Sequence, residues 1–568
     1  MSAPQGSAYC HAGIALATLF AAVSVATAAE AAIVICNQPT KNVSCSAGVC
    51  TATAKNATLN ISDLVNMLGA GDVTVSTGTK AIDIDIGAPF SWASANRLTL
   101  SATGTVVVAH PVTVAGPGGL TIGQHSYTAV GAGHITFWDL SSSLIINTHH
   151  FKLVNSVPTL ASAIAANQCQ ACALANNYDA SVDGTYAAAP ISSYSGWFEG
   201  LGNAISNLSI DDSANGRVGL IASLTGTVGN LALLQVSVTA HKSFNNGGTS
   251  VGALAGYADS AHVTTIRSSG HVTGPTTAYA GGILGSTLGV DEFTDNRSSA
   301  IISGGDYSRV GGLVGYYVGA AILQSDASGS VNSGLTSYAG GLVGYSNSFI
   351  YSSHATGSVT GGENATAGGL VGLFGGSDTL KTSYATGNVM VAKVSHGVAG
   401  GLVGLLQSGT VLQSYATGSV QGTQGGDVGG LVGKANSGST ISQSYAKGSA
   451  TLPTYRGWSG GLVGEDSATL SQVYSIGQVT GGAAAFIGGL IGQDYGAGSN
   501  TAGFWDKDTS GIGNPSQGAG SPANDPGITG LTDAQLKSGL PAGFDPAVWG
   551  QSPTINNGYP YLLALPPG

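Results

Sequence analysis

The sequence predicts an all-β fold, a right-handed parallel β-solenoid (β-helix) with short helical segments near the N-terminus and a C-terminal cap. Two observations indicate this fold class. The pentapeptide GGLVG, or a near match, returns nine times at intervals of 28 to 32 residues, and a fixed period in this range is typical of stacked repeats. Glycine also recurs within every few residues of each repeat, which disfavours helices because each interior glycine costs about 1 kcal/mol.

The N-terminal residues 1–28 are predicted to be an export signal. An apolar run covers residues 12–28, and small residues at 26–28 and 29–31 form candidate cleavage sites. An N-terminal anchor is the alternative. No later segment is long and apolar enough to cross a bilayer, so no transmembrane span is expected once the signal is removed.

Charged residues are scarce, at 8% of the chain, and the formal net charge is -11. The surface is therefore expected to consist mostly of Ser, Thr, Asn, Gln and Gly. The 17 basic residues are scattered along the chain, whereas nucleic-acid-binding proteins gather Lys and Arg on one face. No nucleic acid is therefore expected as a partner.

Cysteine pairing can be predicted in part. Removal of the export signal would take Cys10 with it, and the odd number that is left predicts one unpaired or intermolecular thiol. Local pairs are expected between Cys45 and Cys50 and between Cys169 and Cys172. The second pair lacks the βαβ pattern of a redox site and the further ligands of a zinc site. A structural disulfide, or two thiols without a function, is therefore favoured there.

Residues 29–157 are predicted to be a β-rich N-terminal region. A short helix is expected over residues 62–68, where Ser62 can act as the N-cap. Short alternating strands follow at residues 73–75, 82–86, 98–100, 106–108, 112–114 and 120–122. Lead-in coils over residues 158–250 begin with a second short helix at 159–166.

Residues 251–500 contain the regular repeats, and residues 501–568 form a C-terminal closing segment. Each repeat is predicted to hold three short strands, of which GGLVG is one, with glycine-rich corners between them. The third residue of the pentapeptide is always apolar and is expected to form a buried column, in which each Leu contributes about 1.5–3 kcal/mol. The column consists of Leu254, Ile283, Leu313, Leu342, Leu370, Leu402, Leu431, Leu462 and Leu490.

Two linked motifs recur together in the repeats: GGLVG, and a block that reads SYATG at 383–387 and 414–418 and SYAKG at 444–448. This pair resembles the GLUG repeat of bacterial haemagglutinin-like surface proteins. The lead-in FEGLGNAISNLSI at 198–210 and the tail motifs FWD, LTDAQ and GYPYL are similar to segments that flank such repeats. Residues 70–123 are similar to the N-terminal parts of filamentous-haemagglutinin-like exoproteins. The resemblance implies a secreted or surface-displayed parallel β-helix with an adhesive role.

The function expected from this resemblance is that of an exported, adhesin-like protein, either secreted or associated with the outer membrane at the bacterial cell surface. Its polar, weakly charged surface would attach to host or matrix glycans or proteins, without enzymatic activity and without a cofactor. Two alternatives stay open: a carbohydrate-active β-helix enzyme, either a lyase or a hydrolase, and a purely structural surface spacer. The export route stays open too.

The best candidate for a binding surface is a column with one tyrosine from each of four successive repeats: Tyr384, Tyr415, Tyr445 and Tyr474. Earlier repeats carry varied polar residues at this position, which indicates that the column faces outward: Arg267, Arg297, Asp326 and His354. Four stacked phenols offer a platform for sugar rings or for the side chains of a partner. The alternative is that the stack only stabilises neighbouring strands.

No catalytic residue and no metal site are predicted. The carboxylate pairs at 83/85 and 211/212 have no Lys or Arg cluster beside them and are expected to face solvent. The segment 506–511 begins like a calcium loop, but Gln517 occupies the position of the bidentate Glu, so a turn is favoured. A carbohydrate-active enzyme would require at least two carboxylates that converge in a groove.

Overall fold

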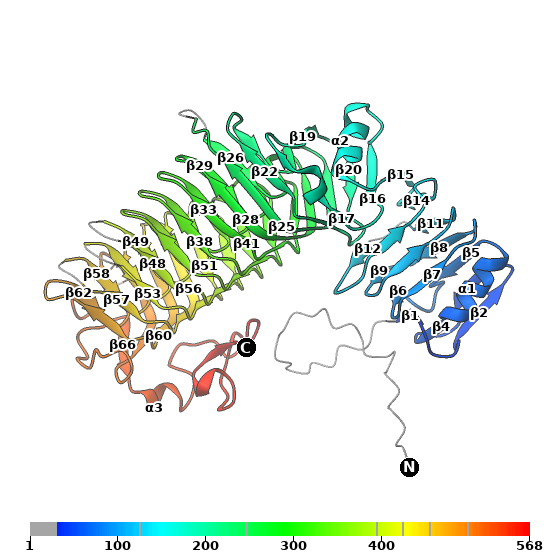
Figure 1. The fold of residues 1–568 in the computed structure, drawn as a ribbon. Coiled ribbons are helices and arrows are strands. Elements are labelled where there is room, and N and C mark those ends of the chain that lie inside the picture. Colours follow the sequence, from blue (N-terminus) through cyan, green and yellow to red (C-terminus); the bar gives the residue numbers. More distant parts are fainter. Residues whose placement is uncertain are drawn as a thin grey trace, which may run out of the picture.

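A parallel β-solenoid of about 16 turns makes up most of the molecule (Figure 1). The computed structural model describes residues 31–123, 127–244, 248–392, 396–422, 425–453, 456–496 and 499–567. Within these ranges the chain contains 68 strands and three α-helices. The all-β solenoid predicted from the sequence is therefore confirmed, whereas the predicted export signal at residues 1–28 lies outside the described residues.

The N-terminal part of the solenoid has three faces. One face has the strand order β12-β9-β6-β1-β4, a second has β13-β10-β7, and the third pairs β3, β5, β8, β11 and β14 in parallel. The strands are β1 (Ala32–Cys36), β3 (Val49–Ala52), β4 (Ala57–Asn60), β5 (Val73–Ser76), β6 (Asp83–Ile86), β7 (Phe90–Trp92), β8 (Arg97–Ser101), β9 (Val106–Val108), β10 (Val112–Val114), β11 (Gly119–Ile122), β12 (Tyr127–Ala129), β13 (Ile135–Phe137) and β14 (Ser143–Ile146). All six strands expected in this region are present.

Two short helices lie where the sequence predicts them, with shifted starts. Helix α1 (Ile61–Ala70) is capped by Asn60, whose side chain accepts a hydrogen bond of 2.8 Å from the Ser62 amide. The prediction of Ser62 as the cap is therefore wrong, because the asparagine two residues earlier already satisfies that amide. Helix α2 (Val157–Ala165) begins with a capping box formed by Ser156 and Thr159.

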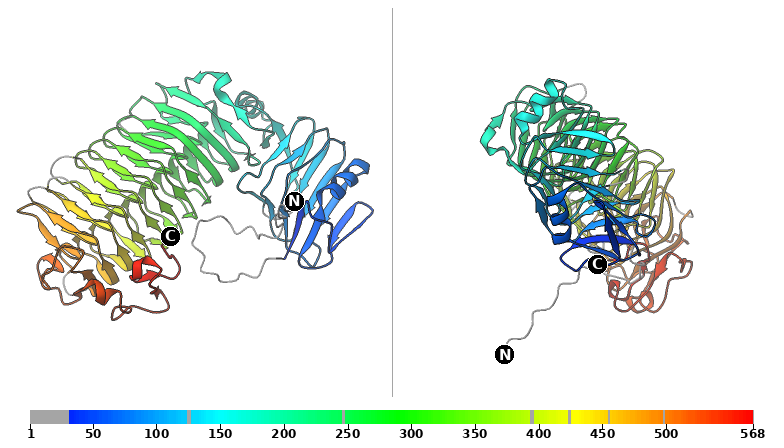
Figure 2. Two further views of the ribbon diagram at one scale, coloured as in Figure 1. Left: turned by 60° about the horizontal axis from the view of Figure 1, so that its bottom comes forward. Right: turned by 90° about the vertical axis from the view of Figure 1, so that its right-hand side faces the viewer.

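The chain reverses direction between the two parts of the solenoid. Strand β15 (His149–Val154) pairs antiparallel with β14 through a hairpin whose two turn residues, Asn147 and Thr148, have φ of 48° and 70°. One apolar core fills the N-terminal part, and a second core extends from Val154 to Ile528. The solenoid bends where the two parts meet (Figure 2). The boundaries predicted at residues 157, 250 and 500 stay predictions.

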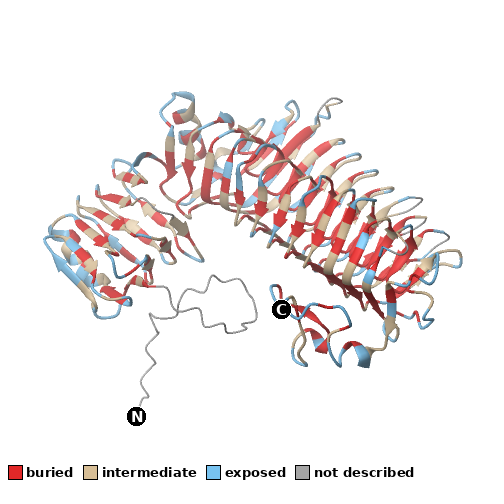
Figure 3. Cartoon of the chain, turned by 180° about the vertical axis from the view of Figure 1, so that it is seen from behind, coloured by how far each residue is buried: buried red, intermediate tan, exposed pale blue. Residues whose placement is uncertain are grey.

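Each later coil crosses three faces, and the coils between Ala278 and Gln421 contain five short strands each. A representative coil has β39 (Tyr338–Gly340) on one face, β40 (Val343–Ser346) on the second, and β41 (Phe349–Tyr351), β42 (His354–Ala355) and β43 (Val359–Gly361) on the third. The prediction of three short strands per repeat is therefore wrong for these coils, because two bends divide the third face into three strands. Buried residues recur at matching positions along successive coils (Figure 3).

The pentapeptide forms a corner, and the prediction that it is a strand is wrong. One strand ends at its first glycine, such as Gly340, and the next begins at its fourth residue, Val343. A Cβ atom on Gly340 would lie 2.0 Å from the Val343 oxygen, because the chain folds back tightly on itself. Only glycine fits such a close approach.

The predicted aliphatic column is confirmed. All nine residues, from Leu254 to Leu490, have no solvent exposure. They sit at the corner rather than in a strand, and their backbones continue the ladder from coil to coil; the Leu342 amide, for example, donates a 2.8 Å hydrogen bond to the Leu370 oxygen. The column therefore links the coils through both apolar contacts and backbone hydrogen bonds.

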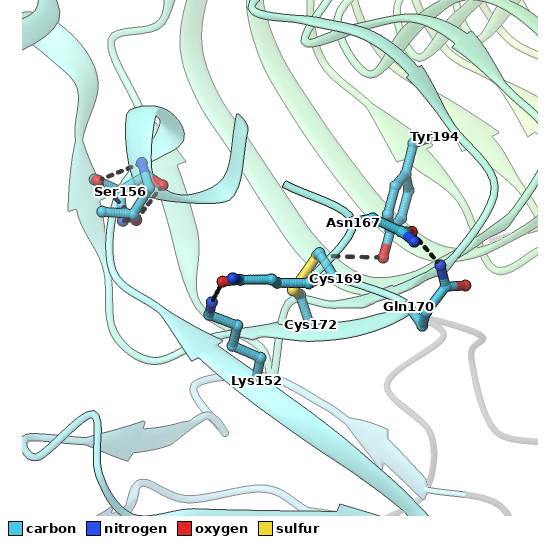
Figure 4. The surroundings of a disulfide bond; sticks show 9 residues. Lys152, Ser156, Asn167, Cys169, Gln170, Cys172 and Tyr194 are labelled. Atoms are coloured by element: carbon cyan, nitrogen blue, oxygen red, sulfur yellow. Dashed lines mark hydrogen bonds between the residues drawn. A yellow bond between two sulfur atoms is a disulfide. The ribbon is translucent and has the colours of Figure 1, made fainter. Parts of the chain in front are cut away.

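Both predicted cysteine pairs are disulfides, Cys45–Cys50 and Cys169–Cys172. The first joins β2 (Val43–Ser46) to β3. The second follows α2 in the chain, and its Cys169 sulfur is 3.7 Å from the Tyr194 hydroxyl (Figure 4). Cys36 is also disulfide-bonded, and no described cysteine is free. The expectation of one unpaired thiol concerns a chain without its first 28 residues, and it stays a prediction.

Candidate functional site: a groove between two sheets

The predicted tyrosine column exists as a continuous stack on the third face. Its members pair in register on β47 (Tyr384–Ala385), β52 (Tyr415–Ala416), β56 (Ser439–Ala446) and β60 (Thr469–Ser475). Successive rings are 5.1, 4.9 and 4.9 Å apart and nearly parallel. His354 stacks on Tyr384 at 4.7 Å, and the polar residues of earlier coils continue the column in register.

Most of this column is not a surface, and that part of the prediction is wrong. Tyr415, Tyr445 and Tyr474 are at most 4% exposed, and only Tyr384 is half-buried. The closing segment, which includes α3 (Asp533–Leu536), β67 (Trp549–Gly550) and β68 (Tyr561–Leu562), folds back along the third face and covers them. Its anchor is a 2.6 Å hydrogen bond from the Tyr474 hydroxyl to the Pro560 oxygen. The stack holds the closing segment against the solenoid.

Replacing Trp549 by Ala is expected to loosen the closing segment. Trp549 is 1% exposed and lies 5.8 Å from the Tyr474 ring and 4.6 Å from the Phe544 ring, and truncation of a buried Trp costs about 3–5 kcal/mol. Limited proteolysis should cut the variant after residue 533 faster than the wild type. Trp138→Ala, at a tryptophan that is 71% exposed, is the control and should behave like the wild type. Equal cleavage of both variants would contradict the anchoring role.

A groove runs along the corner that the pentapeptides form. Two sheets meet there, one with ten strands and one with twelve. The ten-stranded sheet contains β23 (Arg217–Val218), β26 (Thr249–Gly252), β29 (Ala278–Gly281), β34 (Arg309–Gly311), β39, β44 (Thr366–Gly368), β49 (Val398–Gly400), β54 (Asp427–Gly429), β58 (Trp458–Gly460) and β62 (Phe486–Gly488). The twelve-stranded sheet contains β19 (Ile191–Tyr194), β24 (Ile221–Leu224), β27 (Ala255–Asp259), β30 (Leu284–Leu288), β35 (Val314–Tyr317), β40, β45 (Val371–Phe374), β50 (Val403–Leu406), β55 (Val432–Ala435), β59 (Val463–Asp466), β63 (Ile491–Asp494) and β65 (Ala519–Ser521).

Glycine lets the backbones of the two sheets touch at the bottom of this groove. A Cβ atom on Gly315, the last residue of one pentapeptide, would lie 2.5 Å from the Ala280 amide nitrogen on the other sheet. Two rows of side chains then face each other across the corner. One row consists of the residue two positions before each pentapeptide, and the other consists of the residue directly after it. We call the channel between these two rows the inter-sheet groove.

Aromatic side chains dominate the N-terminal half of the inter-sheet groove. Tyr279 on β29 lies 5.3 Å from Tyr316 on β35, and Tyr316 stacks on Tyr345 at 4.9 Å with an 18° angle between the rings. Arg217 lies 4.2 Å above the ring of Tyr257. All four tyrosines are partly exposed. They line both sides of the groove over successive coils, with the Arg217 guanidinium beside them.

A cavity of about 740 Å³ opens at the start of the groove. Its walls come from both sheets, with Tyr257, Ser286 and Tyr316 on one side and Arg217 and Tyr279 on the other. This volume is in the range of ligand pockets in proteins. The cavity and the stacked tyrosines therefore form one continuous recess.

An acidic cluster lies farther along the same groove. Lys434 on β55 forms a 2.9 Å ion pair with Glu465 on β59, and Asp427 on β54 faces both. Burial, and then the neighbouring Glu465 carboxylate, raise the pKa of Asp427 to about 8. The Asp427 Oδ1 atom has no hydrogen-bond partner among the described residues. The cluster therefore holds a neutral carboxyl beside a charged pair at neutral pH.

Replacing Asp427 by Asn is expected to change how stability depends on pH. A carboxyl with a raised pKa in the folded state destabilises the fold as pH rises from its unfolded value, about 3.9, to about 8. The wild type should therefore lose stability over this window, and the variant should lose less. Thermal midpoints measured from pH 4 to 9 check this, with the exposed Asp378→Asn as control. Parallel curves for wild type and Asp427→Asn would contradict it.

The carboxylates weighed in the sequence do not enter the groove. Asp83 and Asp85 are half-buried on β6 in the N-terminal part. Asp211 binds His241 at 2.6 Å, but Asp212 is fully buried and accepts a 2.8 Å hydrogen bond from the Ala214 amide, so the expectation that it faces solvent is wrong. The segment at 506–511 is a turn, as predicted.

The sequence analysis does not identify the groove residues, because the residue types at these positions vary from repeat to repeat. An alignment of the repeats would indicate them, because the residue after the pentapeptide is a tyrosine in three of the first four copies: Tyr257, Tyr316 and Tyr345. Variation next to an invariant corner is typical of a surface that a rigid scaffold presents.

Within the described ranges no group of three or more His, Cys, Asp or Glu side chains could hold a metal ion. No described helix has the length and apolar character needed to span a membrane.

Comparison with known proteins finds no matching family model. A stretch of 80 residues is 39% identical to a protein of Evansella cellulosilytica named "Putative Gly-rich membrane protein", over 13% of this chain and 9% of that protein. The chain is also similar to the crystal structure of a "putative immunoglobulin A1 protease" from Bacteroides ovatus, with a TM-score of 0.29 and 13% identity over 73% of this chain and 93% of that one. Neither likeness assigns the chain to a family.

Proposed function

We propose that this protein is an exported, adhesin-like β-solenoid that attaches to glycans through the inter-sheet groove and catalyses no reaction. The observation that carries this proposal is the row of partly exposed tyrosines in successive coils, among them Tyr279, Tyr316 and Tyr345. The exposed part of each tyrosine offers apolar contact area beside a polar hydroxyl, which suits the mixed apolar and hydroxylated faces of sugar rings. Because the tyrosines repeat from coil to coil, the groove can follow a chain of sugar units.

The rest of the molecule agrees with a role at the cell surface. Only 8% of the residues are charged, so attachment would depend on stacking and hydrogen bonds more than on long-range charge attraction. The resemblance to GLUG-repeat surface proteins points the same way, although a fold does not determine a function by itself. The proposed partners are host or matrix glycans, and the proposed location is the extracellular medium or the bacterial cell surface.

A glycan array probed with the purified full chain tests this proposal. The wild type should bind a defined set of glycans, and the double variant Tyr316→Ala/Tyr345→Ala should lose about tenfold or more in affinity, since stacked aromatic contacts contribute about 0.5–1.5 kcal/mol each. Tyr307→Ala, at a tyrosine that is 58% exposed and outside the groove, is the matched control. Absence of binding would favour the spacer alternative, and equal binding by both variants would place attachment elsewhere.

The second candidate is a carbohydrate-active enzyme, and Asp427 and Glu465 favour it because they converge in the same groove. Their arrangement argues against glycoside hydrolysis: the two carboxyls share a hydrogen bond, whereas hydrolases hold theirs roughly 5–9.5 Å apart to admit the substrate or water. Incubation of the array-selected glycan with the protein should release no reducing ends and no unsaturated sugars. Release that Asp427→Asn abolishes would establish the enzyme instead.

A further inference from the structure

The side chain of Arg309 projects from β34 into the inter-sheet groove among four tyrosine rings. Its guanidinium carbon lies 5.1, 5.0, 5.9 and 5.4 Å from the centroids of Tyr279, Tyr316, Tyr338 and Tyr345. The rings fix the position of the planar guanidinium and displace part of its hydration shell. The guanidinium keeps its charge throughout, because it cannot lose its proton in proteins.

This positive charge has no counter-charge among the residues that the structure describes. Neither Arg309 nor Arg217 forms an ion pair with a carboxylate in the described part of the chain, and Arg309 Nε has no hydrogen-bond partner there. Arg297, by contrast, pairs with Asp295 and Asp326 at 3.3 Å on the third face. Arg217 lines the cavity, and Arg309 lies beside two of the tyrosines that line it, Tyr279 and Tyr316. In an acidic protein, two such guanidiniums indicate an anion-binding site.

We propose that the inter-sheet groove binds an acidic saccharide, with a sugar carboxylate received by Arg309 and a pyranose ring packed against the exposed part of Tyr316. This inference rests on the proposed function and specifies the class of glycan. The forked guanidinium matches the two oxygens of a carboxylate. The 740 Å³ cavity, which Arg217 lines from the other end, gives room for further sugar units and for a second acidic group.

The observations favour a saccharide over an acidic peptide. A peptide would need pockets for its side chains or a free sheet edge to extend, whereas the groove offers partly exposed tyrosine side chains on strands that are already paired on both sides. The rings recur at the spacing of parallel strands, about 4.8 Å, which is close to the length of one pyranose unit. An acidic peptide is therefore one of the outcomes that the test must separate.

Calorimetric titration of the full chain with oligogalacturonate, with its methyl ester and with oligoglutamate tests the inference. The methyl ester keeps the sugar rings and removes the charge. We expect the acid to bind at least tenfold more tightly than the ester, and Arg309→Gln to weaken the acid at least tenfold, so that the acid loses its advantage over the ester. Arg267→Gln, with the same charge change on the third face, should bind the acid like the wild type.

The other outcomes overturn the inference in distinguishable ways. Equal binding of acid and ester, or no effect of Arg309→Gln, would show a neutral ligand and leave glycan attachment standing. Oligoglutamate that binds as tightly as oligogalacturonate, with no loss in Tyr316→Ala, would show a peptide site. No binding of oligogalacturonate together with a neutral glycan bound on the array would reject the acidic ligand alone. No binding of any glycan would reject the proposed function as well.

Discussion

Replacing Leu402 by Asp is expected to unfold the coils around it. Leu402 has no solvent exposure, and its backbone bonds Leu370 on one side and Leu431 on the other at 2.8 and 2.7 Å. The substitution removes about 1.5–3 kcal/mol of apolar burial and places a carboxylate where it has no partner, which costs several kcal/mol more. Because each coil is stabilised by its neighbours, the loss spreads to the adjacent coils.

Thermal unfolding followed by circular dichroism measures this effect. The Leu402→Asp variant should unfold at a clearly lower temperature than the wild type, in a broader transition. Leu402→Met keeps the volume and the apolar character, so it should cost less than about 1.5 kcal/mol and serves as the control. A midpoint for Leu402→Asp within two degrees of the wild type would contradict the buried column.

Replacing Gly429 by Ala is expected to cause a second large loss of stability. A Cβ atom at this corner would lie 1.8 Å from the Val432 oxygen and 2.8 Å from the Gly464 amide nitrogen. Both neighbours are backbone atoms, so they cannot move aside without breaking the ladder between coils. The corner would have to open, and the inter-sheet groove would lose the close contact between its two sheets.

Gly513→Ala is the matched control, because a Cβ atom there meets nothing within 4 Å. That substitution should leave the unfolding midpoint unchanged or raise it slightly, because alanine lowers the conformational entropy of the unfolded chain. Denaturant titration of both variants compares them. Equal midpoints for Gly429→Ala and the wild type would mean that the pentapeptide glycines are not required by close backbone contact.

The periodic features of the fold could be predicted from the sequence. A residue such as Leu402 repeats because the interior of each coil is the same, and buried apolar positions tolerate little variation. The strand limits were harder: the pentapeptide is apolar enough for a strand, yet Gly340 and Gly341 serve a corner. Periodicity identifies which residues are equivalent, but it does not say where the chain bends between them.

The candidate site could be predicted only in part. The register of the tyrosine column followed from the repeat, but its burial depended on the tail, whose contact between Tyr474 and Pro560 joins residues 86 positions apart. No local pattern contains such a contact. The same holds for the groove, where Tyr279 and Tyr316 come from different sheets and adjacent coils.

A crystal structure of the full chain with the array-selected glycan bound would test the central claim most directly. The account predicts sugar rings in the inter-sheet groove, packed against the exposed parts of Tyr316 and Tyr345 with the chain directed toward Tyr279. A glycan bound on the third face or on the N-terminal part, with the groove empty, would contradict it.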